Sequence, residues 1–268
     1  MPKFISSFQN PFVKNVKGLY QKARERKKVG LFPVEGDREV DRALRSGYQL
    51  ETWIFPEMMT ESLRGQWVNR KPDAEEIVLK DEVFGELAYR MGKDHLIGLF
   101  KIPSLRFEDL EMPKNPLVIV AESPEKPGNL GAMLRTADAA GVDLFIVTDS
   151  QVDVFHPNVV RNSLGGIFDV PILSLTNADA LNILRELDTQ ILTTHLEASV
   201  PYDTVDQTGP TAIVVGSEAE GVTDFWVKNA DQRVIIPMQG VVDSLNLSVS
   251  AAILLFEADR QRRSFRKK

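Results

Sequence analysis

Three features of this 268-residue sequence predict an α/β fold that contains a parallel sheet. First, the runs at 117–121, 144–147 and 212–215 are apolar without polar alternation, as in strands that are covered on both faces. Second, stretches with helical spacing separate such runs, which is the order of parallel strands joined by crossover helices. Third, the stretch at 101–116 contains three prolines and no regular period, which indicates a boundary between two domains.

The first hundred residues alternate short helices with short strands, and we interpret them as a small α/β domain. The helical segments begin after turn or capping residues, and the strands are short apolar and aromatic runs. The expected helices cover 11–28, 38–46 and 81–91, and the expected strands cover 31–34, 53–55, 77–79 and 96–100.

The second half has longer apolar runs, for which we expect a parallel sheet with helices on both faces. The expected strands cover 117–121, 144–147, 191–193, 212–215 and 234–236, and the expected helices cover 129–140 and 246–262. Gly141 follows the first of these helices, where glycine can adopt the left-handed conformation that ends a helix. The predicted domains are 1–103 and 117–268, with a linker at 104–116.

The composition excludes several classes of protein. The chain has no cysteine, which removes disulfide scaffolds, thiolate metal sites and cysteine nucleophiles. The lysine-interrupted N-terminal segment does not resemble a signal peptide, and no run approaches the roughly 20 apolar residues of a membrane helix. His95, His156 and His195 lack the spacing of metal ligands, so we expect no metal. These features predict a soluble, cytoplasmic protein.

Charge is distributed unevenly along the chain, whose net charge is −6. Residues 1–30 carry eight Lys and Arg against one Glu, a net charge of +7, and residues 257–268 carry +4, which leaves −17 for the rest. Because salt screens charges beyond about 8–10 Å, a basic segment can bind a polyanion although the whole chain is acidic. The alternative is that both ends are solvated helices, and charge alone leaves both interpretations open.

Three loops follow expected strands and are candidates for ligand binding, since ligands of open α/β sheets bind at the carboxyl ends of the strands. The first loop contains Gly128 and Asn129 and leads into a helix that carries Arg135. Gly128 allows a tight turn, and Asn129 can cap the helix. The structural alternative is an ordinary cap, with Arg135 paired to Asp138 three residues further on.

The second loop begins at Gly216 and ends near Gly221, and it includes Glu218. Its glycines let the backbone approach a planar ligand, although a surface turn before a helix also explains them. The third loop precedes the last helix and contains Ser244 and Asn246. These residues suit a bound ligand, but they also suit a helix cap with close packing behind it.

Together the three loops resemble, in order and approximate spacing, the signature motifs of the SpoU (TrmH) family of SPOUT-superfamily RNA ribose 2′-O-methyltransferases. The matching residues are 128–131 through Arg135, then 216–218 with Gly221, then 236–238 with 244–249. Residues 32–36 and 39–40 are similar to the accessory substrate-binding domain of many members. Ala219 departs from the pattern, since many members have Gly there, and its methyl group would narrow the ligand cleft.

The resemblance implies a knotted, parallel-sheet SPOUT methyltransferase domain preceded by a small N-terminal α/β substrate-binding domain. In the family, S-adenosylmethionine lies in the knot and is held largely by backbone groups. Carried over to this chain, the cofactor-binding positions are Gly216, Ile236 and Leu245, with Met238 nearby. The dinucleotide fingerprint GxGxxG is absent, which fits a cofactor bound in this other way.

The reaction implied by the resemblance is methyl transfer to a ribose 2′-hydroxyl. The family's catalytic positions correspond to Arg135, Ser244, Asn246 and Glu218. Arg135 is associated with activation of the hydroxyl, but a guanidinium pKa exceeds about 12. A role that holds the RNA phosphate and lowers the pKa of the hydroxyl therefore suits Arg135 better than the role of a base.

The resemblance also implies an RNA substrate and a homodimer. Asn129 would help shape the pocket, and basic residues of the first helix would contact phosphates, namely Lys14, Lys17, Arg24, Arg26, Lys27 and Lys28. Ribosomal RNA is favoured because many two-domain relatives modify it. The alternatives are a transfer RNA substrate and a catalytically inactive RNA-binding relative. An unrelated nucleotide-dependent enzyme is less favoured, because the chain has no P-loop motif.

Overall fold

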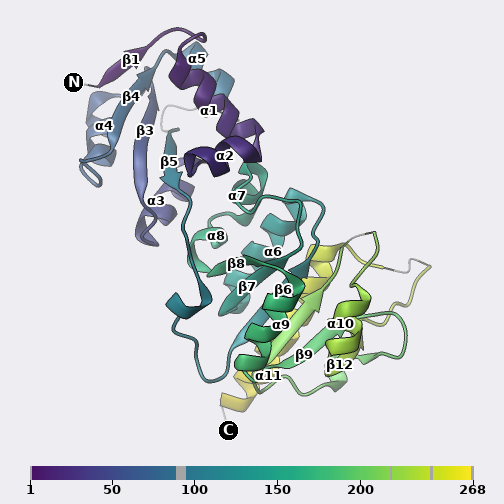
Figure 1. Ribbon diagram of the computed structural model, residues 1–268. Helices are drawn as coiled ribbons and strands as arrows, with labels where there is room; N and C mark the ends of the chain where they lie inside the picture. Colours follow the sequence, from purple (N-terminus) through teal and green to yellow (C-terminus); the bar gives the residue numbers. More distant parts are fainter. Residues whose placement is uncertain (1, 89–94, 218, 242–243, 267–268) are drawn as a thin grey trace. The chain divides into compact units, whose positions relative to one another are not determined.

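The computed structural model describes residues 2–88, 95–217, 219–241 and 244–266. They form two compact units (Figure 1). Unit 1 extends to Ser104 and also contains Phe155–Arg161, whereas unit 2 contains Leu105–Val154 and the residues from Asn162 onward. Within the described parts of the chain, no helix is long and apolar enough to cross a membrane.

Unit 1 contains a five-stranded sheet. Its order is β1 (Lys3–Ile5), β4 (Glu75–Leu79), β3 (Leu50–Pro56), β5 (Ile97–Lys101) and β2 (Leu31–Glu35). The first three strands are parallel, and β5 is antiparallel to both of its neighbours. The helices of this unit are α1 (Pro11–Gln21), α2 (Ala23–Val29), α3 (Asp37–Arg45), α4 (Glu61–Val68) and α5 (Asp81–Leu87).

The basic segment at 11–28, expected as one helix, forms the two helices α1 and α2. They are separated at Lys22, whose backbone is extended with φ −130° and ψ 118°. Asn10 caps α1 by accepting a 2.9 Å hydrogen bond from the Phe12 amide. The Arg26 guanidinium donates to the Leu19 carbonyl, so α2 folds back on the last turn of α1. The single-helix prediction was wrong because this break depends on a buried contact.

Residues 155–161 add a segment from the second half of the chain to unit 1. The ring of Phe155 lies 4.5 Å from the ring of Phe32, measured between centroids, and Phe32 is fully buried. Most of the short helix α7 (Pro157–Ser163) belongs to this segment. The domain boundaries predicted from the sequence do not anticipate it.

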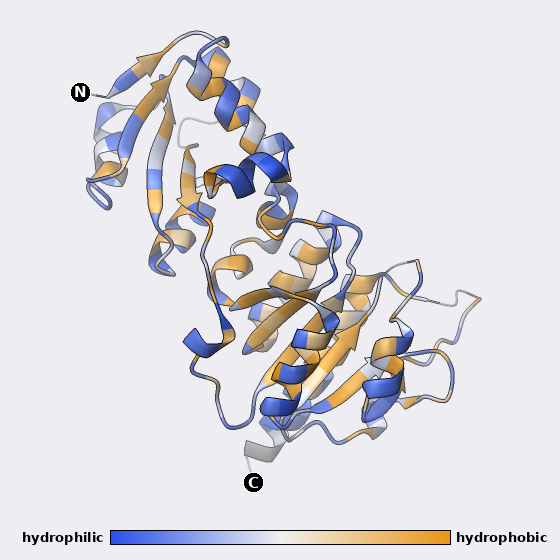
Figure 2. Cartoon of the chain, in the orientation of Figure 1, coloured by the Kyte–Doolittle hydropathy of each residue, from blue (hydrophilic) through white to orange (hydrophobic). Residues whose placement is uncertain are grey.

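Unit 2 contains a seven-stranded sheet whose pairs are all parallel, which confirms the predicted parallel sheet. Its order is β10 (Val200–Pro201), β12 (Gln232–Ile235), β9 (Gln190–Thr194), β11 (Thr211–Val215), β6 (Leu117–Glu122), β7 (Leu144–Thr148) and β8 (Ile172–Leu175). The edge strands β8 and β10 were not predicted, because they are short and only partly buried. Figure 2 shows the central strands as hydrophobic along most of their length.

Helices cover both faces of this sheet. Leu184 of α9 (Asn177–Glu186) and Trp226 of α10 (Asp224–Asn229) pack on one face with Val118 and Val214. The helices α6 (Pro127–Ala140), α8 (Gly166–Asp169) and α11 (Leu247–Arg266) cover the other face, where α6 packs against α8 and α11. The expected linker at 104–116 packs on unit 2, because Leu105, Phe107 and Met112 contact its core.

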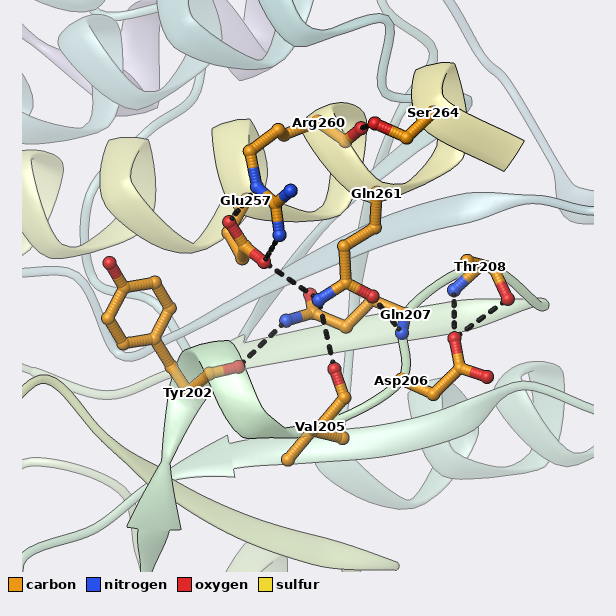
Figure 3. Close-up of polar contacts among 9 residues, drawn as sticks. All are labelled: Tyr202, Val205, Asp206, Gln207, Thr208, Glu257, Arg260, Gln261 and Ser264. Carbon is orange, nitrogen blue, oxygen red and sulfur yellow. Dashed lines mark hydrogen bonds and ion pairs between the residues drawn. The ribbon is translucent and has the colours of Figure 1, made fainter. Parts of the chain in front are cut away.

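The second half of α11 is attached to the segments that lead into β6 and β11. Arg262 donates hydrogen bonds of 2.7–3.2 Å to four backbone carbonyls, those of Asn115, Pro116, Gln207 and Gly209. Gln261 accepts from the Gln207 amide at 2.8 Å and donates to the Val205 carbonyl at 3.0 Å (Figure 3). These contacts hold the helix at the amino ends of the strands, away from the loops with the sequence motifs.

Candidate functional site

The three loops with the sequence motifs follow β6, β11 and β12. These strands belong to one parallel sheet, so their carboxyl ends lie along the same edge. Gly216, directly after β11, is buried, and Ile236, directly after β12, is half-buried. This is the edge at which open α/β sheets bind their ligands. The fold thus places the predicted motifs at one candidate site.

A hydrogen bond joins the first motif to the third. The Asn246 side-chain amide donates to Asn129 Oδ1 over 3.1 Å. Asn246 is also the N-cap of α11, since its Oδ1 accepts from the Ser248 amide at 2.9 Å and from the Ser248 hydroxyl at 2.6 Å. Both asparagines therefore lie at helix starts that face each other, and Asn246 has a structural role whatever its chemical role.

The second motif forms a closed loop. Ser217 and Gly221 exchange two backbone hydrogen bonds, of 2.9 and 3.1 Å. A Cβ on Gly216 would lie 1.9 Å from the Gly221 carbonyl carbon, so the return of the chain requires glycine there. Gly221 itself has φ 70°, a conformation that glycine adopts without strain. Ala219 is exposed, and Glu218 lies outside the described residues.

Arg135 is available to bind a ligand. Its side chain is exposed on α6, and within the described part of the chain it has no hydrogen bond or ion pair. The pair with Asp138, the alternative explanation for Arg135, is therefore not formed. Ser244 is exposed, whereas Met238 and Leu245 are half-buried. An exposed, unpaired guanidinium in the middle of α6 suits an anionic ligand.

The basic residues proposed as phosphate contacts divide into two groups. Lys14, Lys17 and Arg24 are exposed, as are Lys27 and Lys28. Lys17 also forms a long 3.4 Å ion pair with Glu86 on the surface. Arg26 contradicts the prediction, because its side chain is fully buried and donates to the Leu19 carbonyl. Arg26 joins α1 to α2 and is not available to a phosphate.

The buried carboxylate of Glu122, the last residue of β6, was not among the residues predicted from the sequence. It is 1% exposed and accepts hydrogen bonds from Asn177 Nδ2 at 2.6 Å, from the Thr223 amide at 2.7 Å and from the Thr223 hydroxyl at 2.7 Å. A buried carboxylate needs such donors to replace water. One signal was present in the sequence, namely a Glu that ends an otherwise apolar strand.

A cavity of about 360 Å³ lies at the opposite edge of the same sheet. It is lined by Leu117 at the start of β6, by Asp143 just before β7 and by the final turns of α6 and α11. None of the predicted site residues lines it. Because ligands bind at the carboxyl ends of parallel strands, we favour the site with the motifs. The described residues contain no cluster of three or more His, Asp or Glu suited to a metal.

Comparison with known proteins identifies the family of the chain. Residues 116–256 match the SpoU rRNA Methylase family, and residues 10–98 match the MRM3-like substrate binding domain. The chain is 29% identical over 255 residues to the 23S rRNA (guanosine(2553)-2′-O)-methyltransferase RlmP of Bacillus subtilis, covering 95% of this chain and 98% of that protein.

Two solved structures are similar over nearly the whole chain. The AdoMet-bound rRNA methyltransferase of Sinorhizobium meliloti has a TM-score of 0.88 at 29% identity, covering 96% of this chain and 97% of that one. The SpoU methyltransferase AviRb of Streptomyces viridochromogenes, in complex with AdoMet, has a TM-score of 0.87 at 26% identity, covering 96% and 99%. With the family match spanning more than half of the chain, this protein belongs to the SpoU rRNA methylase family.

Proposed function

We propose that this protein transfers a methyl group from S-adenosylmethionine to a ribose 2′-hydroxyl of ribosomal RNA. The observation that carries the proposal is the hydrogen bond between Asn129 and Asn246, which brings the first and third motifs together. Family membership supports the reaction type. The relatives that match over nearly the whole chain are named as rRNA methyltransferases, which supports the substrate class.

The residues at the site fit the proposed cofactor. Ile236, Met238 and Leu245 are half-buried and apolar, as an uncharged adenine ring requires. Gly216 directly follows β11, so its backbone can supply the polar contact to the edge of the ring that the resemblance implies. The bound cofactor supplies an electrophilic methyl group on a sulfonium, whose carbon–sulfur bond would break, leaving a neutral thioether, as the new C–O bond forms and the acceptor hydroxyl gives up its proton to water.

The chain's own residues would position the hydroxyl and assist the loss of its proton. Arg135 can hold an adjacent phosphate, and its positive charge lowers the pKa of a nearby hydroxyl. Asn246 and Asn129 fix the two helix starts that border the site. Ser244 is exposed beside them and can hydrogen-bond the ribose, and Glu218 completes the proposed catalytic group.

Unit 1 would bind the RNA. Its exposed cations Lys14, Lys17 and Arg24 lie on α1 and α2, and phosphate contacts supply most of the affinity of basic proteins for nucleic acid. The match to a substrate binding domain over 10–98 supports this role. The names of the relatives that match over nearly the whole chain favour ribosomal RNA over transfer RNA. The unpaired Arg135 favours an active enzyme over an inactive RNA-binding relative.

Three further expectations accompany the proposal. We infer a knot in unit 2, because β11 inserts between β6 and β9 while the final helix returns to pack against α6. We infer a homodimer, supported by Val249 and Phe256 of α11, which are 45% and 44% exposed although large and apolar. A cytoplasmic location follows from the proposed substrate.

The test is transfer of a tritiated methyl group from S-adenosylmethionine to total RNA of a strain that lacks this protein. We expect label in the ribosomal RNA, in a 2′-O-methylated nucleotide after digestion, and loss of label with Arg135→Ala. Label in transfer RNA would show that the substrate is transfer RNA and not ribosomal RNA. Absence of label, with cofactor binding retained, would favour the inactive relative. Full activity of Arg135→Ala would remove Arg135 from the site.

A further inference from the structure

Glu122 stands out among the buried charged groups because it ends the strand that precedes the first motif and contacts Thr223, which follows the second motif. It ends β6, and the next residue, Ser123, turns the chain with φ 47° toward α6. Glu122 is not in the groups assigned to substrate or cofactor. Within the described part of the chain it forms no ion pair, so its charge is balanced by hydrogen bonds alone.

The loop that carries the second motif is attached to β6 at both of its ends. At its start, Val215 of β11 pairs with Ala121 of β6 in the parallel ladder. At its end, Thr223 donates its amide and its hydroxyl to Glu122 at 2.7 Å each. The two anchor points on β6 are therefore adjacent residues, and Val215 and Thr223 are held next to each other by this strand.

A second set of contacts fixes the direction of the carboxylate. Asn177, the first residue of α9, donates to Glu122 Oε1 at 2.6 Å. Trp226 Nε1 donates to Asn177 Oδ1 at 2.8 Å, which sets the orientation of that amide, and Trp226 is fully buried. Thr223 precedes α10 and Trp226 lies in its first turn, so Glu122 is bound to this helix directly and through Asn177.

We propose that Glu122 is a positioning residue that holds the described residues of the second motif, 216–217 and 219–222, in the conformation that binds the cofactor. This inference rests on the proposed function, because it assigns the cofactor to that motif. Residues such as Ser217 and Gly221, which already pair with each other, lose less conformational freedom on binding. Release of the anchor at Thr223 would therefore weaken cofactor binding, while the reacting groups on α6 and α11 stay in place.

Glu122→Gln tests the proposal with little change of volume. Glutamine offers one oxygen in place of two, so one of the three donors at this position faces an amide nitrogen. We expect the Kd for S-adenosylmethionine, measured by calorimetry, to rise about 10-fold, as for the loss of one buried hydrogen bond. We expect kcat at saturating cofactor to change by less than about 2-fold, because only binding is affected.

Thr223→Val is the second variant, since it removes a hydroxyl from an exposed residue and leaves the carboxylate intact. Its Kd should rise about 3- to 5-fold, because the backbone amide contact remains. Thr189→Val is the matched control. Thr189 is 4% exposed and donates to the Leu184 carbonyl at 3.0 Å, at the amino end of β9. The Thr189→Val variant should have a lower Tm but an unchanged Kd for S-adenosylmethionine.

The outcomes separate the inference from the proposed function. A Kd that is unchanged in Glu122→Gln and Thr223→Val, while the wild type binds, overturns the positioning role alone. A Kd raised equally by Thr189→Val shows general destabilisation and also overturns it. A wild-type protein that does not bind S-adenosylmethionine overturns the proposed function, and the assignment of Glu122 with it.

Discussion

Asn246 Nδ2 and Asn129 Oδ1 lie 3.1 Å apart, although 117 residues of sequence separate them. The contact joins the start of α6 to the start of α11, and these helices pack on the same face of the sheet. Helix starts expose unpaired amides, so their relative position decides where polar ligand groups can be bound. This one hydrogen bond thus joins the first motif to the third and fixes their relative position.

This link predicts energetic coupling between the two asparagines. Asn246→Ala should lower the free energy of unfolding by about 1 kcal/mol through the lost helix cap. The double variant with Asn129→Ala should deviate from additivity by about 0.5–3 kcal/mol, as expected for residues in contact. Urea unfolding of the wild type, the two single variants and the double variant measures this deviation. The control is the double variant of Asn129→Ala with Thr189→Val, whose effects on the free energy of unfolding should be additive. Equal deviations from additivity in the two double variants would contradict the coupling of Asn129 with Asn246.

Gly216→Ala should abolish cofactor binding while the sheet stays folded. The added Cβ would lie 1.9 Å from the backbone of Gly221, so the loop must open to accept it. Calorimetry with S-adenosylmethionine, together with far-UV circular dichroism, measures both effects. Gly209→Ala is the matched control, since a Cβ there would meet no atom within 4 Å. Normal cofactor affinity in Gly216→Ala would exclude this loop from the site.

The exposed cations of unit 1 should determine the salt dependence of RNA binding. Replacing Lys14, Lys17 and Arg24 by Ala should reduce the slope of log Kd against log salt by about 0.7–0.9 for each lost phosphate contact. Filter binding at several salt concentrations measures this slope. Lys228→Ala is the control, because Lys228 is equally exposed but lies in unit 2. An unchanged slope in the triple variant would refute the assignment.

Arg26→Ala should act differently from those three substitutions. Arg26 is fully buried and bonded to Leu19, so its loss leaves a cavity and an unsatisfied carbonyl. We expect a lower Tm, by several degrees, and an unchanged salt slope for RNA binding. A reduced slope with an unchanged Tm would show that Arg26 contacts phosphate after all.

Glu257 should contribute to stability in a pH-dependent way. Hydrogen bonds from Arg260, at 2.7 Å to each carboxylate oxygen, lower the pKa of Glu257 against the opposing effect of burial (Figure 3). A carboxyl whose pKa is lower in the folded state stabilises the protein above its unfolded pKa, about 4.3. That contribution disappears as the pH falls through the lower folded value.

Glu257→Gln should therefore be less stable than the wild type at pH 7, and the difference should shrink below about pH 4. Urea unfolding at pH 7, 5 and 3.5 measures the difference. Asp224→Asn is the control, because its ion pair with Lys228 is exposed and should contribute little at any pH. A difference that stays constant across this range would show that Glu257 contributes by packing alone.

The sequence predicted the central strands of unit 2 and the loops of the site for the same reason. Strands buried on both faces are continuous apolar runs, and the loops after them are rich in glycine and capping residues. The roles of Arg26 and Glu122 could not be predicted in this way. Charged residues are usually exposed, and only the folded structure brings Leu19 or Thr223 within reach. The break at Lys22 depends on the buried contact between Arg26 and the Leu19 carbonyl.

The segment at 155–161 has a consequence for how the chain is made. Residues up to Ser104 leave the ribosome before Phe155 exists, and N-terminal domains generally fold first during synthesis. Phe32 then lacks the ring that lies 4.5 Å from it in the finished protein. Unit 1 can therefore complete its packing only after the first segment of unit 2, Leu105–Val154, has been translated. A fragment that stops at Ser104 would expose this aromatic surface to aggregation.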